Sequence, residues 1–322
     1  MTPLGKATAP PTADIKAIFQ AFKQHCLAPP FRQAGFRIET PGRYVRDVGE
    51  VRQEVNVNAQ GNRRGDPNRG FTLDLAVGEP LTLNEVPAGC FTCRLGYLKC
   101  ASDAWYHLDP DNVTSLGELV TLELERYALP LLAWATTHQR VAQLQALTAQ
   151  GHAQLCPRLR ELVPGFGRDL AAEYQALWVT DVAPLLTAAG FAERDDGLLC
   201  RTLEGGITQA FAMRHMQNNT GTLLDMEGIL ALHLPTTEHP EPHLPLQQPA
   251  WWMVSSTYVI TGQSSHYRRY QLAAHTPAQM GALLRIDLAQ HLLPWFERHG
   301  TASAIAASRA QVDADLQQRA AR

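Results

Sequence analysis

The sequence predicts an α+β protein of two similar domains, each an antiparallel sheet packed by an N-terminal and a C-terminal helix. Two Gly-Phe pairs, Gly35-Phe36 and Gly190-Phe191, each follow an apolar helical stretch and precede strand-like runs. Each half then ends with a Leu-Pro pair inside a second helical stretch, Leu129-Pro130 and Leu293-Pro294. The same order of elements in both halves indicates a duplicated domain.

Alternating residues keep their register between the halves. Arg46 matches Arg201, and the run Val51, Gln53, Val55, Val57 matches Ile207, Gln209, Phe211, Met213. Such period-two alternation is typical of half-buried strands. Any two α+β segments share some of these patterns, and the identity between the halves is low. Ordered agreement across a helix, three strands and a Leu-Pro helix nevertheless favours duplication.

The predicted organisation has five segments. They are a disordered N-terminus over 1–12, a first α+β repeat over 13–150, a linker over 151–169, a second repeat over 170–300 and a C-terminal helical tail over 301–322. In the first repeat we expect a helix over 13–28 that ends at Pro29-Pro30. Strands are expected at 43–48, 51–58, 71–77 and 91–98. A second helix is expected to begin at Ser115, and Pro130 is expected to kink or divide it. In the second we expect helices at 168–188 and from Thr276 to His299, and strands at 198–203, 207–213, 223–234 and 253–260.

The amino-acid composition indicates which broad class of protein this is. The chain has 322 residues, of which 45% are apolar and 18% charged, which suffices for two ordinary cores. No apolar run approaches the roughly 20 residues of a membrane span, and the N-terminus lacks a signal-peptide core. We therefore expect a cytoplasmic protein without a membrane partner. A net charge of −3 argues against a protein that coats nucleic acid.

The two halves resemble a bacterial family catalogued as domain of unknown function forty-three-oh-four. The resemblance rests on Gly35, Phe36, Gln60, Arg94 and Leu95 in the first half and on Gly190, Phe191 and Gln217 in the second. It covers roughly residues 13–148 and 170–300 as two divergent copies. The second copy lacks the Arg-Leu-Gly of residues 94–96, and the resemblance implies no established activity.

One group of residues suggests a metal. Cys90, Cys93, Cys100 and His107 are four soft or borderline ligands within a short stretch, a set that zinc accepts. A strand would point Cys90 and Cys93 to opposite faces, and the second half has no counterpart. Cysteines of this kind are more often small apolar residues of a reduced core. We therefore predict no cofactor, with zinc as the alternative.

Other residues suggest binding. The hairpin loop after the second strand carries Arg63, Arg64 and Arg69, which could clasp an anion, although such arginines are commonly solvated. Both halves place an amide pair in this loop, Gln60 with Asn62 and Gln217 with Asn219. The pair Trp251-Trp252 is a candidate for an interface, as tryptophan is enriched at binding hot spots, or for the core.

Two classes of function remain open. We favour a non-enzymatic protein-binding module, with toxin neutralisation in bacterial conflict as its setting, since no catalytic motif stands out. We expect another protein as the partner, and not nucleic acid. The alternative is an enzyme with a site in a cleft between the repeats, using His107, Asp109 and Asp111 or His215.

Overall fold

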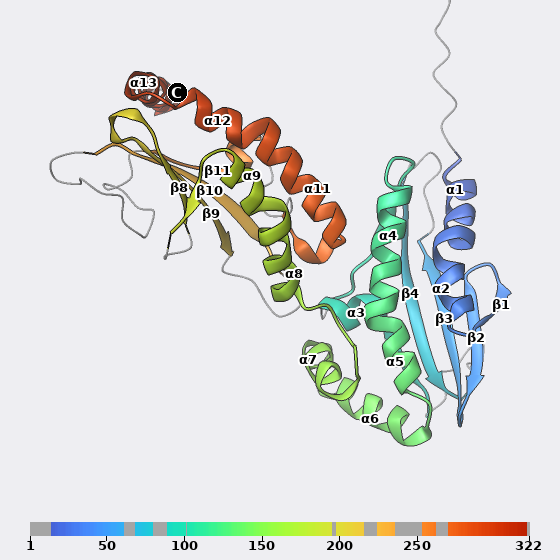
Figure 1. Ribbon diagram of the computed structural model, residues 1–322. Helices are drawn as coiled ribbons and strands as arrows, with labels where there is room; N and C mark the ends of the chain where they lie inside the picture. Colours follow the sequence, from blue (N-terminus) through green and yellow to red (C-terminus); the bar gives the residue numbers. More distant parts are fainter. Residues whose placement is uncertain are drawn as a thin grey trace, which may run out of the picture. The chain divides into compact units, whose positions relative to one another are not determined.

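The computed structural model describes residues 14–60, 68–79, 89–100, 102–194, 198–215, 224–235, 253–261 and 270–320. The chain divides into two compact units, Met1–Arg168 and Asp169–Arg322. Each unit combines one antiparallel sheet with helices and has its own apolar core (Figure 1). The predicted fold class, α+β with two similar domains, is therefore confirmed.

The first sheet is an antiparallel meander. Its strands follow the order β1-β2-β3-β4-β5, and β6 also pairs with β4. They are β1 (Arg37–Thr40), β2 (Arg43–Val48), β3 (Val51–Ala59), β4 (Arg69–Gly78), β5 (Phe91–Arg94) and β6 (Tyr106–Leu108). Val55 of β3 lies opposite Leu75 of β4, and Val57 lies opposite Leu73. Because alternate residues share one face of a strand, Val55, Leu73 and Leu75 project together into the first core.

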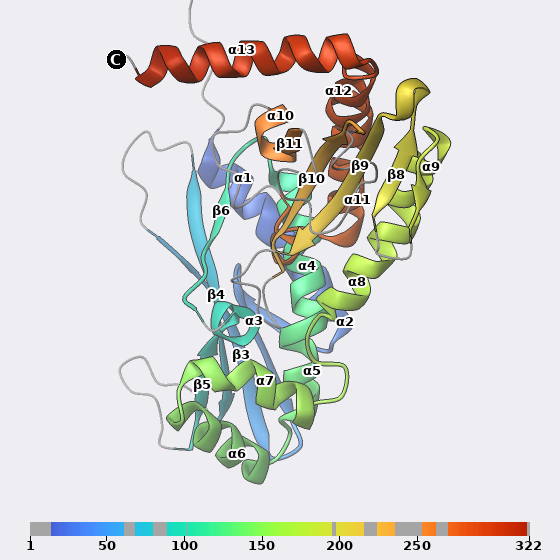
Figure 2. The ribbon, with the colours of Figure 1, turned by 90° about the vertical axis from the view of Figure 1, so that its left-hand side faces the viewer.

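Two long, interrupted helices pack side by side against this sheet (Figures 1 and 2). One consists of α1 (Ile15–Phe22), the π-helical turn η1 (Lys23–Leu27) and α2 (Ala28–Gln33), and the other of α4 (Val113–Glu123), the π-helical turn η2 (Leu124–Ala128) and α5 (Leu129–Trp134). Gly117 lets them approach closely, since a Cβ atom there would lie 2.7 Å from Sγ of Cys26. Three further helices are α3 (Leu95–Cys100), α6 (His138–Ala149) and α7 (His152–Leu162).

The second unit has the same order of elements. Its meander, β7-β8-β9-β10-β11, consists of β7 (Ala192–Glu193), β8 (Leu199–Thr202), β9 (Thr208–His215), β10 (Met226–His233) and β11 (Met253–Ser256). The first helical stretch is α8 (Leu170–Leu177), η3 (Trp178–Val182) and α9 (Ala183–Ala188), and the second is α11 (Pro277–Asp287), η7 (Leu288–Leu292) and α12 (Leu293–Arg298). Gly281 again permits a close approach, here to the carboxylate of Asp181.

Shorter elements complete the second unit. They are the 3-10 turns η4 (Glu204–Gly206) and η6 (Leu272–Ala274), the short helix α10 (Thr257–Ile260) and the C-terminal helix α13 (Ala302–Ala320). The start of α13 packs on the second core, because Ile305 is fully buried there. Nε2 of His299 also lies 2.9 Å from Oγ of Ser308.

Each of the four main helical stretches contains a five-residue π-helical turn directly before an X-Pro step. The prolines are Pro29, Pro130, Pro184 and Pro294. In a regular α-helix a proline ring collides with the carbonyl four residues earlier, and the wider turn relieves that collision. The expectation that Pro29-Pro30 stops the first helix was therefore wrong, because the helix continues to Gln33. Pro130 does divide its helix, through η2.

Three other expectations differ from the structure. Residues 151–169, expected as a linker, contain α7, which buries Leu155, Cys156 and Leu159 in the first core. The strand expected over 91–98 ends at Arg94, and α3 follows because helical spacing buries both Leu95 and Leu98. The strand expected over 253–260 likewise ends at Ser256, and α10 begins at the next residue.

In the parts of the chain that the structure describes, no helix has the length and apolar composition to cross a membrane.

Candidate functional site

A buried amide ties the sheet of the first unit to the end of its second helix. Gln53 of β3 is fully buried, and its Nε2 donates to the carbonyls of Leu132 at 2.6 Å and Ala135 at 2.9 Å. Its Oε1 accepts a hydrogen bond of 2.7 Å from Nε of Arg46. The Arg46 guanidinium also donates to the carbonyl of Ala34. These polar groups are thus satisfied within the fold.

The second unit contains the same set of contacts. Nε2 of Gln209 donates to the carbonyls of Phe296 and His299, at 2.7 and 3.2 Å. Oε1 of Gln209 accepts from Nε of Arg201 at 2.7 Å, and Arg201 also donates to the carbonyl of Ala189. The matched Arg and Gln residues of the two halves therefore connect the sheet to the helices in the same way in each unit.

A buried carboxylate beside a π-helical turn also occurs in both units. Glu123, 1% exposed, accepts from Nζ of Lys99 at 2.8 and 3.0 Å and from the hydroxyl of Tyr106. In the second unit Asp287 precedes its π-helical turn and accepts from the hydroxyl of Tyr270 at 2.6 Å. Both carboxylates are enclosed in the core, so a structural role is sufficient to account for them.

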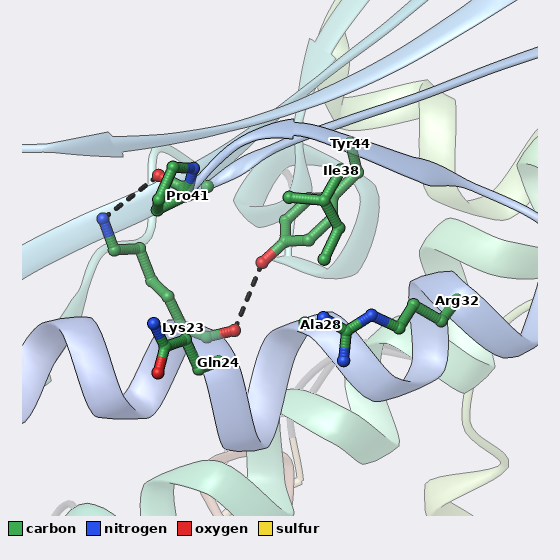
Figure 3. Close-up of a pocket in the computed structure, with 8 residues that line it drawn as sticks. Lys23, Gln24, Ala28, Arg32, Ile38, Pro41 and Tyr44 are labelled. Carbon is green, nitrogen blue, oxygen red and sulfur yellow. Dashed lines mark hydrogen bonds between the residues drawn. The ribbon is translucent and has the colours of Figure 1, made fainter.

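A solvent-open pocket lies in the first unit between η1–α2 and the β1–β2 hairpin (Figure 3). Its volume is about 70 Å³, and it is lined by Lys23, Gln24, Ala28, Arg32, Ile38, Pro41, Gly42 and Tyr44. Nζ of Lys23 donates to the carbonyl of Pro41 at 3.2 Å, and the Tyr44 hydroxyl donates to the carbonyl of Lys23 at 3.3 Å. In Figure 3 the Arg32 side chain folds back along the helix towards Ala28.

The pocket is cationic. Lys23 is 9% exposed, and its Nζ lies 5.0 Å from the centre of the Phe19 ring. The Arg69 guanidinium lies 5.6 Å from the same ring. Burial, and then the charge of Arg69, lower the pKa of Lys23. None of the described residues that line the pocket is a carboxylate.

Tyr44 forms the floor of the pocket from β2. Its ring stacks on Phe31 at 4.4 Å between centroids, and the side chain is 1% exposed. Burial raises the pKa of Tyr44 to about 12, against the opposing effect of the Arg32 charge. At neutral pH Tyr44 is therefore a neutral hydrogen-bonding group and adds no negative charge to the pocket.

The second unit lacks both cations of this pocket at the corresponding positions. Trp178 begins η3 as Lys23 begins η1, and Leu199 follows Gly190 at the distance at which Tyr44 follows Gly35. Both Trp178 and Leu199 are buried, and the Trp178 ring stacks on Phe211 at 6.4 Å. Thr187 takes the place of Arg32. The cationic lining is therefore a feature of the first unit.

The structure places one predicted binding residue, Arg69, near Lys23, because both cations lie over the Phe19 ring. Gln60 is exposed at the end of β3, and its backbone N–H donates to the carbonyl of Gly70 at 3.0 Å. The other predicted binding residues lie outside the described residues: Asn62, Arg63, Arg64, Gln217, Asn219, Trp251 and Trp252. Sequence reasoning missed Lys23 and Arg32. The signal was a lysine next to the apolar Phe19 and Phe22, at a position that holds Trp178 in the second half.

The predicted zinc residues are only partly described. Cys90 and Cys93 are buried, and burial raises the pKa of both thiols, that of Cys93 to about 12. His107 is exposed on β6, and the Cys100 side chain lies outside the described part of the chain. Among the side chains that the structure describes, no three His, Cys, Asp or Glu residues gather as a metal site. The prediction of no cofactor, with zinc at this set as the alternative, is untested.

Of the residues named for the enzymatic alternative, Asp109 has a structural role. Asp109 accepts backbone N–H bonds from Asp111 and Asn112, both at 2.9 Å, and so shapes the turn before α4. The His215 side chain lies outside the described residues.

The raised pKa of Cys93 gives a chemical test of its environment. At pH 8 a thiol of pKa about 12 is thiolate for only about one part in 10⁴, and the thiolate is the reactive form. We expect Cys93 to resist iodoacetamide in the folded chain and to react fully in guanidinium, as measured by mass spectrometry of the peptides. Rapid labelling of Cys93 in the folded chain would contradict the buried placement.

Comparisons of the chain with models of protein families, with curated proteins and with solved structures found no match.

Proposed function

We propose that the chain is a non-enzymatic protein-binding module, and that the pocket of its first unit receives an acidic group of the partner. The observation that carries this proposal is a pocket whose described lining includes Lys23 and Arg32 but no carboxylate. An opposite charge placed in such a pocket makes charge-assisted hydrogen bonds, which are stronger than neutral ones.

The cost of burying the Lys23 ammonium also supports an acidic ligand in this pocket. A buried ammonium loses hydration, and the partners of Nζ among the described residues are one backbone carbonyl and one aromatic ring. Its pKa is lowered accordingly, with burial as the main cause. An acidic group bound beside Nζ would offset this cost, so the charge is better explained by a ligand than by the stability of the free protein.

The two units differ in the residues at the pocket positions, which supports a binding role for the first unit alone. We propose that the units are divergent tandem copies related to the family of domain of unknown function forty-three-oh-four, and that the first copy alone binds through this pocket. In the second copy the buried apolar residues Trp178 and Leu199 stand at the positions of Lys23 and Tyr44. The proposed setting is the neutralisation of a toxin in bacterial conflict.

The test compares three forms of the tagged full chain in affinity capture from the native host. The variant Lys23→Met, Arg32→Gln removes the two pocket charges. The control Lys16→Gln, Arg298→Gln removes one lysine and one arginine that are exposed outside the pocket. We expect one stoichiometric protein to bind the wild type and the control and to be lost from the pocket variant.

The captured protein is then purified and its affinity for the chain is measured. Because exposed charge pairs are screened by salt, we expect the dissociation constant to rise with ionic strength for the wild type. Circular dichroism confirms that the pocket variant is folded. A partner that binds the pocket variant as tightly as the wild type would contradict the proposal.

A further inference from the structure

We infer that the pocket of the first unit selects a tetrahedral dianion of the phosphate class over a carboxylate. This inference rests on the proposed function, because it names the acidic group that the same pocket receives. The chemistry is shared by free phosphate and by a phosphoryl group on a protein side chain.

The first argument is the number of positive charges. Lys23 and Arg32 line the pocket, and Arg69 is close enough to lower the pKa of Lys23. Tyr44 stays neutral because its pKa is raised to about 12. A single carboxylate would neutralise one of the two cations that line the pocket, whereas a dianion neutralises both.

The second argument is the number and arrangement of donors. Nζ of Lys23 has three N–H groups, and one hydrogen bond from it, to the Pro41 carbonyl, is seen. The Arg32 guanidinium has five N–H groups in a planar fork that suits phosphate oxygens. The two side chains reach the pocket from different places along η1 and α2 (Figure 3). The donors of Lys23 and Arg32 therefore lie at separate points of the pocket wall, and the oxygens of a tetrahedral ion offer acceptors in more directions than the two coplanar oxygens of a carboxylate.

The third argument is size. A water molecule needs about 10–15 Å³ of a cavity of this kind. The pocket, at about 70 Å³, therefore has room for several waters or for one small polyatomic ion. It is too small to enclose a nucleotide or a sugar, so only the charged group of a larger ligand would enter.

The second unit provides the internal comparison. Where the first unit has Lys23 and Arg32, the second has Trp178 and Thr187, and Trp178 packs on Phe211. The two units otherwise share the Arg–Gln hydrogen bonds and the carboxylate beside the π-helical turn. The cations of the pocket are therefore not required by the fold, which assigns them to a ligand.

The experiment is an NMR titration of the full-length chain at pH 8 and constant ionic strength with inorganic phosphate, sulfate, O-phosphoserine and acetate. We expect saturable shifts of the backbone amides of residues 23–44 with phosphate and sulfate, and binding of acetate at least about tenfold weaker. In Lys23→Met, Arg32→Gln the phosphate affinity falls by at least about tenfold, and in Lys16→Gln, Arg298→Gln it stays unchanged. Binding of O-phosphoserine as tight as that of phosphate indicates a phosphorylated side chain as the source, and weaker binding indicates free phosphate.

Failure of this inference can be told apart from failure of the proposed function. If acetate binds as tightly as phosphate, the preference for a dianion is wrong while recognition of an acidic group stands. If phosphate binds the pocket variant and the wild type equally, the pocket is not its site, and the inference is overturned. If no anion binds and the pocket variant still captures the wild-type partner, both the inference and the proposed function fall.

Discussion

Replacing Gln53 by alanine is expected to destabilise the first unit by about 3–5 kcal/mol, since the change leaves several buried polar groups without partners. The carbonyls of Leu132 and Ala135 lose their donor, and Nε of Arg46 loses its acceptor. Gln53 has no exposed surface, so water does not replace these bonds without opening the core.

The variant Gln209→Ala removes the equivalent amide of the second unit and is expected to cost a similar free energy there. The control is Gln33→Ala, which changes an exposed amide at the end of α2 and is expected to alter stability by less than about 0.5 kcal/mol. Urea unfolding measures the free energy, and hydrogen exchange with mass spectrometry locates the effect. Faster exchange is expected in β2, β3 and α5 for Gln53→Ala and in β8, β9 and α12 for Gln209→Ala. An unfolding free energy of Gln53→Ala equal to that of Gln33→Ala would contradict the structural role of the amide.

The sequence predicted the fold class because its evidence is local. Alternating Val51, Gln53, Val55 and Val57 identify a strand, and all four fall in β3. Gln53 shares one face of β3 with Val51, Val55 and Val57, so the alternation agrees with its burial but does not identify its partners. In the structure the Gln53 amide donates to the carbonyl end of a helix about 80 residues later, a partner that no local pattern identifies.

The helix over residues 152–162 shows a second limit of local signals. Pro157 and the nearby Gly165 and Gly167 suggested a linker. The helix forms nevertheless, because Leu155, Cys156 and Leu159 are fully buried in the first core, and tertiary burial outweighs the local cost of Pro157.

The candidate site could be predicted only in part. Arg69 stood out as one of several arginines in a loop. The pocket itself depends on the contact between η1 and the β1–β2 hairpin, where Nζ of Lys23 meets the carbonyl of Pro41, 18 residues later. A lysine in an amphipathic helix is ordinarily solvated, so its burial follows only from the tertiary fold.

Replacing Glu123 by alanine is expected to destabilise the first unit by about 3–5 kcal/mol, because the change leaves a largely buried ammonium without its counter-ion. Nζ of Lys99 lies 2.8 and 3.0 Å from the two oxygens of Glu123, and the Lys99 side chain is 17% exposed. The hydroxyl of Tyr106 loses its acceptor at the same time.

The double variant Glu123→Leu, Lys99→Met separates the loss of a charge partner from the loss of packing. It replaces both charges by apolar side chains of similar size, and replacing a whole buried ion pair is often neutral in free energy. We therefore expect the double variant to recover most of the stability that Glu123→Ala loses, as measured by urea unfolding in a double-mutant cycle whose single variants are Glu123→Leu and Lys99→Met. If the double variant is as unstable as Glu123→Ala, the ion pair is not the source of the loss, and the packing of the π-helical turn that begins at Leu124 is the better explanation.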